Sequence, residues 1–187
     1  MNTKKHFFTT YDLILSALFI ALITVGAFIK IPLGAVPITL QFMFVLLAGQ
    51  ILLPKNAAIT LLIYTAMGLL GLPVFSGSGG FSYVLNPTFG YIVGFIFASV
   101  IISAISHKGK PTLARYIFAN FVGFVTVYTF GLIYYILLSV FYFGEVLDLG
   151  SVLLMGFVVF IPTDFAFCIL TAVISKRIKP FIARKTT

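Results

Sequence analysis

The sequence predicts an all-α membrane protein with six transmembrane helices. The chain of 187 residues is 61% hydrophobic and only 9% charged, and its mean hydropathy is +1.18. These proportions leave too few polar residues to cover a globular surface. The apolar residues form continuous runs, whereas a transmembrane β-barrel needs alternating polar and apolar positions. We therefore expect one integral-membrane domain over residues 1–187.

The six predicted helices follow one another with short polar breaks. The apolar runs cover residues 13–28, 38–53, 57–72, 88–105, 116–142 and 150–174. Pro32, Gly34 and Pro37 end the first run, and Pro54 ends the second. The second and third runs are short for a complete crossing, so a tilted or partly re-entrant pair is an alternative. Two crossings are preferred because Lys55 between them then reaches water.

A Gly/Ser-rich stretch, residues 73–87, lies between the third and fourth runs. It contains no charged residue, yet it carries Phe75, Phe81 and Tyr83. Glycines permit tight turns, and aromatic side chains seek apolar surroundings. The stretch therefore predicts a loop that folds back onto the bundle as a lid or cavity wall. An ordinary solvated turn is the alternative.

The distribution of basic residues predicts the topology. With six crossings, eleven of the twelve Lys and Arg fall on one side, and only Lys30 falls on the other. By the positive-inside rule both termini are then cytoplasmic, in a multi-pass protein of the plasma membrane. The net charge of +8 would suggest nucleic-acid binding in a soluble protein. Here membrane topology explains it, so we expect the lipid bilayer and no nucleic acid as a partner.

One acidic residue lies well inside an apolar run. Asp164 falls within 150–174, whereas the other acids lie at predicted membrane edges: Asp12, Glu145 and Asp148. An acid at the centre of a membrane helix costs roughly 2.5–3.5 kcal/mol, and it is tolerated facing a bundle interior, a partner or a ligand. Pro162 is expected to loosen the helix one turn before this carboxylate. Asp164 is thus the first candidate for ligand binding, and a purely structural hydrogen bond within the bundle is the alternative.

Small and polar residues mark further candidate contacts. Ala17 and Ala21 form a small-xxx-small pair, which lets another helix approach closely. A similar pattern in the fourth run, at Gly90, Gly94 and Ala98, is explained more often by packing within the bundle. Gln41, Asn86 and Thr88 are candidate polar wall residues, although helix capping or bonds between helices would account for them equally well.

Several absences exclude catalytic classes. The chain has no phosphate-binding G-x-x-x-x-G-K-[ST] sequence. Its two histidines, His6 and His107, lie near predicted membrane edges, which argues against an intramembrane Ser–His pair or a histidine metal site. The single cysteine, Cys168, excludes an internal disulfide and is expected to be a small buried side chain. We therefore expect no enzyme activity, no cofactor and no bound metal.

The order of motifs along residues 17–174 resembles the BioY family, the biotin-binding S components of energy-coupling factor (ECF) transporters. The matching segments are Val36–Gln41, Leu46–Gly49, Leu53–Lys55, Gly68–Phe75, Asn86–Tyr91 and Ile161–Asp164. The resemblance implies six helices and a vitamin site near the extracytoplasmic side, covered by the loop between the third and fourth helices. It also implies that Ala17 and Ala21 dock the transmembrane coupling subunit, and that two separate ATPase subunits drive transport.

The resemblance also implies a set of substrate contacts. Asp164 would accept hydrogen bonds from the N–H groups of a ureido ring. The other implied contacts are aromatic walls and polar groups: Phe81, Tyr83, Phe89, Tyr91, Phe167, Ser78, Asn86 and Gln41.

The sequence departs from the family pattern where cations are expected. The last helix of the family usually reads Pro-x-Asp-x-x-Lys, and Phe167 occupies the lysine position. Some members carry an Arg after the Gly-Tyr of the fourth helix, where this chain has Ile92, and the loop often carries an Asn where it has Ser78. A ligand carboxylate would then face water, Lys30 or backbone N–H groups of the loop.

These departures leave four functional hypotheses. The leading one is an S component for biotin or a close relative. The second is an S component for another small amphiphile such as lipoate. The third is a structural or assembly membrane protein in which Asp164 only holds helices together, and the fourth is a facilitator that works without ATPases.

Overall fold

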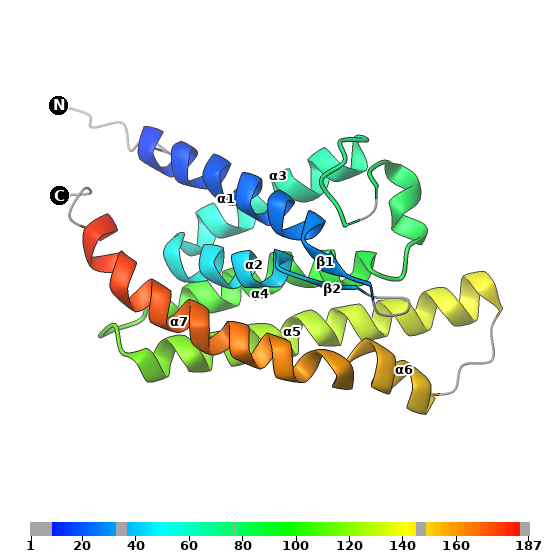
Figure 1. The fold of residues 1–187 in the computed structure, drawn as a ribbon. Helices are drawn as coiled ribbons and strands as arrows, with labels where there is room; N and C mark the ends of the chain where they lie inside the picture. Colours follow the sequence, from blue (N-terminus) through cyan, green and yellow to red (C-terminus); the bar gives the residue numbers. More distant parts are fainter. Residues whose placement is uncertain (1–8, 33–36, 77, 145–148, 184–187) are drawn as a thin grey trace.

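The computed structural model describes residues 9–32, 37–76, 78–144 and 149–183, and it is almost entirely helical (Figure 1). The helices are α1 (Thr10–Phe28), α2 (Gln41–Ile51), α3 (Pro54–Leu69), α4 (Phe89–Ser106), α5 (Leu113–Leu138), α6 (Leu149–Gly156) and α7 (Ile161–Ala183). Two short strands, β1 (Lys30–Ile31) and β2 (Ile38–Thr39), pair antiparallel between α1 and α2. A π-helical turn, Ser139–Phe143, continues α5, and 3-10 turns cover Phe81–Leu85 and Val158–Phe160.

Four segments are long and apolar enough to cross a membrane, with mean hydropathies of 2.0 to 2.3. They are Thr10–Phe28, Phe89–Ser106, Leu113–Phe143 and Val152–Ile182. Two further helices, α2 with 11 residues and α3 with 16, match the two short runs of the sequence. The predicted six helical segments are therefore confirmed in the described residues, with α6 and α7 together forming the sixth.

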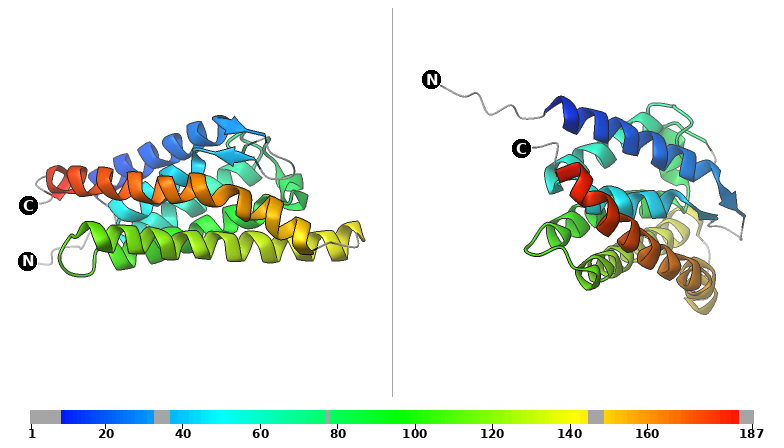
Figure 2. Two further views of the ribbon diagram at one scale, coloured as in Figure 1. Left: turned by 60° about the horizontal axis from the view of Figure 1, so that its bottom comes forward. Right: turned by 60° about the vertical axis from the view of Figure 1, so that its left-hand side comes forward.

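The sixth segment differs from the single helix predicted over 150–174. It is interrupted by the 3-10 turn Val158–Phe160, and α7 begins afresh at Ile161. Pro162 is the second residue of α7, where its missing N–H costs little. The expected loosening before Asp164 is therefore a complete break, and Asp164 lies in the first turn of α7. Figure 2 shows α6 and α7 lying along α5, a packing that residue contacts confirm.

Helices α4 and α5 pack closely because glycines lie between them. A Cβ atom added to Gly90 would lie 2.2 Å from the Cβ of Tyr134, and one on Gly131 would lie 2.5 Å from the ring of Tyr91. A Cβ atom added to Gly94 would lie 2.9 Å from the Cα atom of Val127 in α5. The interpretation of the fourth-run glycines as internal packing residues is therefore confirmed.

A buried polar network joins α2, α5 and α7. The Gln50 side chain donates to Asn120 Oδ1 at 2.7 Å, and the Asn120 amide donates to Thr171 Oγ1 and to the Cys168 carbonyl, both at 2.8 Å. All three polar side chains are completely buried, and Cys168 is buried as predicted. Because unpaired buried polar groups are costly, this network fixes the positions of the three helices that also surround the candidate site.

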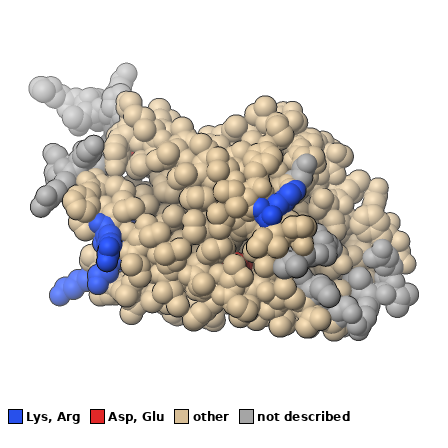
Figure 3. Space-filling model, in the orientation of Figure 1, with Lys and Arg blue, Asp and Glu red and all other residues tan. Residues whose placement is uncertain are grey.

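The basic side chains of the described residues gather at one end of the bundle. Lys55 is the second residue of α3, and six others lie on the α4–α5 connection, the start of α5 and the end of α7: Lys108, Lys110, Arg115, Lys176, Arg177 and Lys179. Lys30, on β1, lies at the opposite end of α1. Figure 3 shows one face of the molecule that is almost free of charge, with basic atoms at its left edge and at one isolated position.

Candidate substrate-binding site

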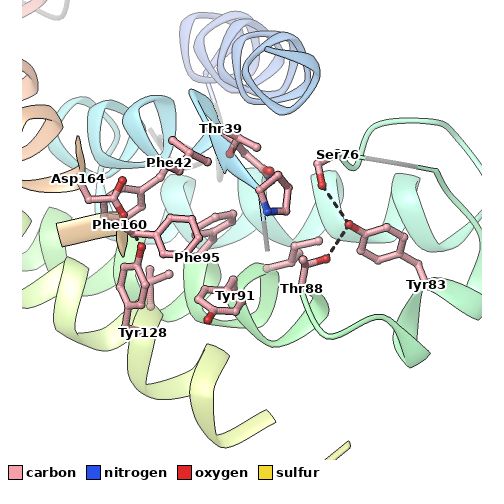
Figure 4. A pocket seen from close by; sticks show the side chains of 15 residues that line it. Thr39, Phe42, Ser76, Tyr83, Thr88, Tyr91, Phe95, Tyr128, Phe160 and Asp164 are labelled. Carbon is pink, nitrogen blue, oxygen red and sulfur yellow. Dashed lines mark hydrogen bonds between the residues drawn. The ribbon is translucent and has the colours of Figure 1, made fainter. Parts of the chain in front are cut away.

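A pocket lies between α2, α4, α5 and α7, closed on its remaining sides by the β-hairpin and the α3–α4 loop (residues 70–88) (Figure 4). Its walls are mainly aromatic or aliphatic, with a few polar groups. The lining residues are Pro37, Ile38, Thr39, Gln41, Phe42, Ser76, Tyr83, Thr88, Tyr91, Ile92, Phe95, Val127, Tyr128, Phe160 and Asp164. A mostly apolar cavity with a few convergent polar groups is typical of a small-molecule site.

Asp164 and Tyr128 form the polar end of the pocket. The Tyr128 hydroxyl donates to Asp164 Oδ2 at 2.6 Å, and both side chains are only 5% exposed. The structure shows no other hydrogen-bond or ionic partner for this carboxylate within the described ranges. The start of α7 also places the positive end of the helix dipole beside the carboxylate. The remaining lone pairs can accept hydrogen bonds from a ligand that carries N–H groups.

Aromatic side chains hold Tyr128 and form the middle of the pocket. The Tyr128 ring lies 5.6 Å from Tyr91 and 6.2 Å from Phe160, and Phe42 lies 6.3 Å from Phe95. Tyr91 in turn donates its hydroxyl to the Gly156 carbonyl at 2.9 Å, just before the break between α6 and α7. These contacts give the middle of the pocket apolar walls that suit a saturated ring or an alkyl chain.

A second polar cluster forms the opposite side of the pocket (Figure 4). Thr88 donates its hydroxyl to Asn86 Oδ1 at 2.7 Å, and the Tyr83 hydroxyl lies 2.8 Å from Thr88 Oγ1. Because the single Thr88 proton is directed at Asn86, Tyr83 is the donor to Thr88. The Tyr83 oxygen can then accept from Ser76, whose Oγ lies 3.4 Å away, or from a ligand.

The α3–α4 loop packs against the bundle rather than extending into solvent. The ring of Phe75 is fully buried against Gly68 and lies 4.6 Å from the Tyr83 ring. Gly80, at a φ of +108° that favours glycine, donates its N–H to the Gly68 carbonyl at 2.7 Å. These contacts explain how an uncharged loop supplies three lining residues of the pocket, Ser76, Tyr83 and Thr88.

Gln41 connects the pocket wall to the same loop. Its amide donates to the Tyr64 hydroxyl at 2.9 Å, and Tyr64 donates to the Val74 carbonyl at 2.7 Å. Gln41 and Tyr64 are almost completely buried. A displacement of the loop would therefore be transmitted to the side chain that begins α2.

Comparisons with known proteins agree on one family. The model of the BioY family matches residues 1–184. A probable biotin transporter BioY of Lysinibacillus sphaericus is 42% identical over 172 residues, covering 91% of this chain and 87% of the relative. The biotin transporter BioY of Thermotoga maritima is 36% identical over 169 residues, covering 90% of this chain and 95% of the relative. The chain belongs to the BioY family.

A solved structure supports the same assignment. The S component for biotin from an ECF-type ABC transporter superposes with a TM-score of 0.80 at 30% identity, covering 96% of this chain and 95% of that one. The fold predicted from the BioY resemblance is confirmed. As a member of this family, the chain is a multi-pass membrane transport protein and not an enzyme. The described residues also contain no cluster of His, Cys, Asp or Glu that could hold a metal.

The structure brings together four of the nine substrate contacts implied by the BioY resemblance. Asp164, Tyr91, Gln41 and Tyr83 line one pocket. Ile92, at the position where some members carry an arginine, lines it too and is 3% exposed.

The other five implied contacts lie outside the pocket lining. Ser78 is exposed, and Phe81 is 78% exposed. Asn86 holds Thr88, and Phe89 packs edge-on against Tyr134 at 5.8 Å. Phe167 is partly buried against the hydrophobic core.

Sequence reasoning did not identify Tyr128 and several other lining residues. Tyr128 is one of the nine tyrosines of the chain, and nothing local separates it from the others. Its partnership with Asp164 spans 36 residues and depends on how α5 packs against α7. Thr39, Phe42 and Phe160 likewise reach the pocket through the packing of distant segments, which no local pattern predicts. For Tyr128 the only local signal is a hydroxyl group within an apolar run.

The cavity between these walls is narrow. Its volume is about 60 Å³, whereas small-molecule sites usually provide about 300–1,000 Å³. A vitamin-sized ligand therefore enters only if some of the walls separate.

Proposed function

We propose that this chain captures biotin and acts as the substrate-binding S component of an ECF transporter. The observation that carries the proposal is the buried Asp164–Tyr128 pair at one end of an aromatic pocket, in a fold that matches a solved S component for biotin. The whole chain would serve as one substrate-binding domain. Transport would be driven by a coupling subunit and two ATPase subunits supplied separately.

The geometry suits the chemistry of biotin. A ureido ring presents two N–H donors, and the free lone pairs of the Asp164 carboxylate can accept them while Tyr128 remains bound to Oδ2. Phe42, Phe95 and Tyr91 would surround the sulfur-containing ring and the alkyl chain. Lipoate has no ureido group to use this carboxylate, so Asp164 favours biotin over that alternative.

The α3–α4 loop would act as the lid of the site. Opening requires it to separate from α3, where Phe75 and the Gly80–Gly68 bond hold it. Gly71 and Gly80 both adopt positive φ angles, 103° and 108°, and are suitable hinges. Ser78 and Phe81 would approach the ligand only as the lid moves.

The outer face of α1 would dock the coupling subunit. Ala17 and Ala21 are both exposed, next to Leu13, Ile14 and Leu18 on the same helix, which are 50–62% exposed. Small residues on an apolar helix face permit close approach of a partner helix. The segregation of basic residues supports cytoplasmic termini in the plasma membrane, which would put the ATPases at the Lys/Arg-rich end.

Equilibrium binding of biotin to the purified protein tests the proposal, together with mass spectrometry of small molecules that co-purify. Wild-type protein should bind biotin in preference to lipoate. Asp164→Asn should weaken binding by about tenfold or more, because it exchanges a charged acceptor for an amide. Unchanged binding in Asp164→Asn would remove the assigned role of Asp164. A protein that binds neither ligand would point to a purely structural role, and uptake without ATPases would indicate a facilitator.

A further inference from the structure

The pocket has a carboxylate at one end, and none of its described lining residues is basic. Figure 4 shows Asp164 and Tyr128 on one side, Ser76 and Tyr83 on the other, and Phe95 and Tyr91 between them. Biotin has a neutral ring that donates hydrogen bonds and, at the far end of its chain, a carboxylate. If Asp164 holds the ring, the ligand carboxylate lies toward the Ser76 side. A carboxylate left there without a cation would be held only weakly.

Lys30 lies beside that side of the pocket. The β-hairpin pairs Lys30 with Thr39, which lines the pocket. The Lys30 ammonium donates to the carbonyl oxygen of Ser76, which also lines it. Two immediate neighbours of Lys30, one on the hairpin and one on the α3–α4 loop, are therefore pocket walls.

The ammonium can serve the loop and a ligand together. A lysine carries three N–H donors, and the Ser76 carbonyl takes one of them. The other basic side chains of the described residues lie at the opposite end of the bundle, as shown above, so none of them competes for this position. In Figure 3 the isolated basic position lies near a recess in which acidic atoms are visible.

We propose that Lys30 is a specificity-determining residue that binds the carboxylate of the substrate at the mouth of the pocket. This inference rests on the proposed function and specifies which end of the ligand faces outward. It also gives this chain a cation in place of those missing at Ile92 and Phe167. A ligand whose tail is neutral would not benefit from Lys30.

The test compares biotin with biotinamide, which has the same ring and chain but no charge, by equilibrium binding in detergent. Wild type should bind biotin more tightly than the amide. Lys30→Gln should lower the affinity for biotin about 10- to 100-fold, as expected for a lost hydrogen bond between charged groups, and should change the affinity for biotinamide little. Lys30→Arg should keep most of the preference for biotin over biotinamide. Lys108→Gln, at the opposite end, is the matched control and should bind both ligands like wild type.

The outcomes separate this inference from the proposed function. If wild type binds biotin and Lys30→Gln binds it equally well, the role of Lys30 is wrong and the proposed function stands. If Lys30→Gln loses both ligands equally while keeping the wild-type melting temperature, Lys30 only holds the α3–α4 loop and the inference again fails. If wild type binds neither ligand, both proposals fail.

Discussion

The hydrogen bond between Tyr128 and Asp164 provides the sharpest test of the site. Tyr128→Phe removes one hydroxyl and keeps the ring, which packs against Phe124 at 4.7 Å and Phe157 at 5.1 Å. Leaving a buried hydrogen-bonding group without its partner costs about 1–3 kcal/mol, and both residues are only 5% exposed. We therefore expect a loss of about 2 kcal/mol. For a chain of this length, that corresponds to a melting temperature lower by about 4–8 °C.

The same substitution should weaken biotin binding to a smaller extent. Tyr128 fixes one carboxylate oxygen, so its removal leaves the side chain to be ordered by the ligand, at a cost of about 1 kcal/mol or roughly fivefold in affinity. A double-mutant cycle with Asp164→Asn isolates the pair, and Tyr142→Phe, at an exposed position, is the control. A coupling energy below about 0.5 kcal/mol would refute the assignment of this pair as the organising contact of the pocket.

Three further predictions concern other parts of the molecule. Gly131→Ala places a Cβ atom 2.5 Å from the Tyr91 ring, and this overpacking should cost about 1–3 kcal/mol, seen as a lower melting temperature; an unchanged value would contradict the packing. Burial lowers the pKa of His107 below its ordinary 6.5, so the folded state favours neutral imidazole. Stability should therefore fall as the pH drops below about 6.5, and His107→Gln should reduce the dependence of the melting temperature on pH. A variant whose melting temperature depends as steeply on pH as that of wild type would contradict this role of His107. Tryptophan at Ala17 and Ala21 should abolish co-purification of the coupling subunit while leaving biotin binding intact, and loss of both would indicate misfolding.

Most of the fold could be predicted because it depends on local properties of the sequence. Continuous apolar runs and proline breaks locate the helices within a few residues, including the short α2 and α3. The division of the sixth run was predicted only as a loosening, since Pro162 is compatible with either a kink or a new first turn. Which of the two occurs depends on packing, such as the hydrogen bond from Tyr91 of α4 to the Gly156 carbonyl at the end of α6.

From the residues alone, the site could be predicted where one residue stood out chemically, and the BioY resemblance added Tyr83 and Tyr91. Asp164 was evident because it is a single acid within an apolar run, and Gln41 was a candidate because it is a polar residue just inside the second apolar run. The aromatic walls were less predictable, since the chain has 22 Phe and 9 Tyr and all of them satisfy the same local pattern. Phe81 and Tyr83 illustrate this: they lie two residues apart in one 3-10 turn, yet Phe81 is 78% exposed and Tyr83 is 5% exposed.

The position of Asp164 at the start of α7 reduces the need for a cation beside this carboxylate. At the centre of a continuous helix, its carboxylate would require a neutralising cation, and no basic residue lies inside any of the predicted apolar runs. At the start of a helix the dipole and a tyrosine hydroxyl already stabilise negative charge. The carboxylate can therefore remain an acceptor without a lysine beside it. This accounts for how the chain can carry Phe167 at the usual cation position and still retain a site for N–H donors.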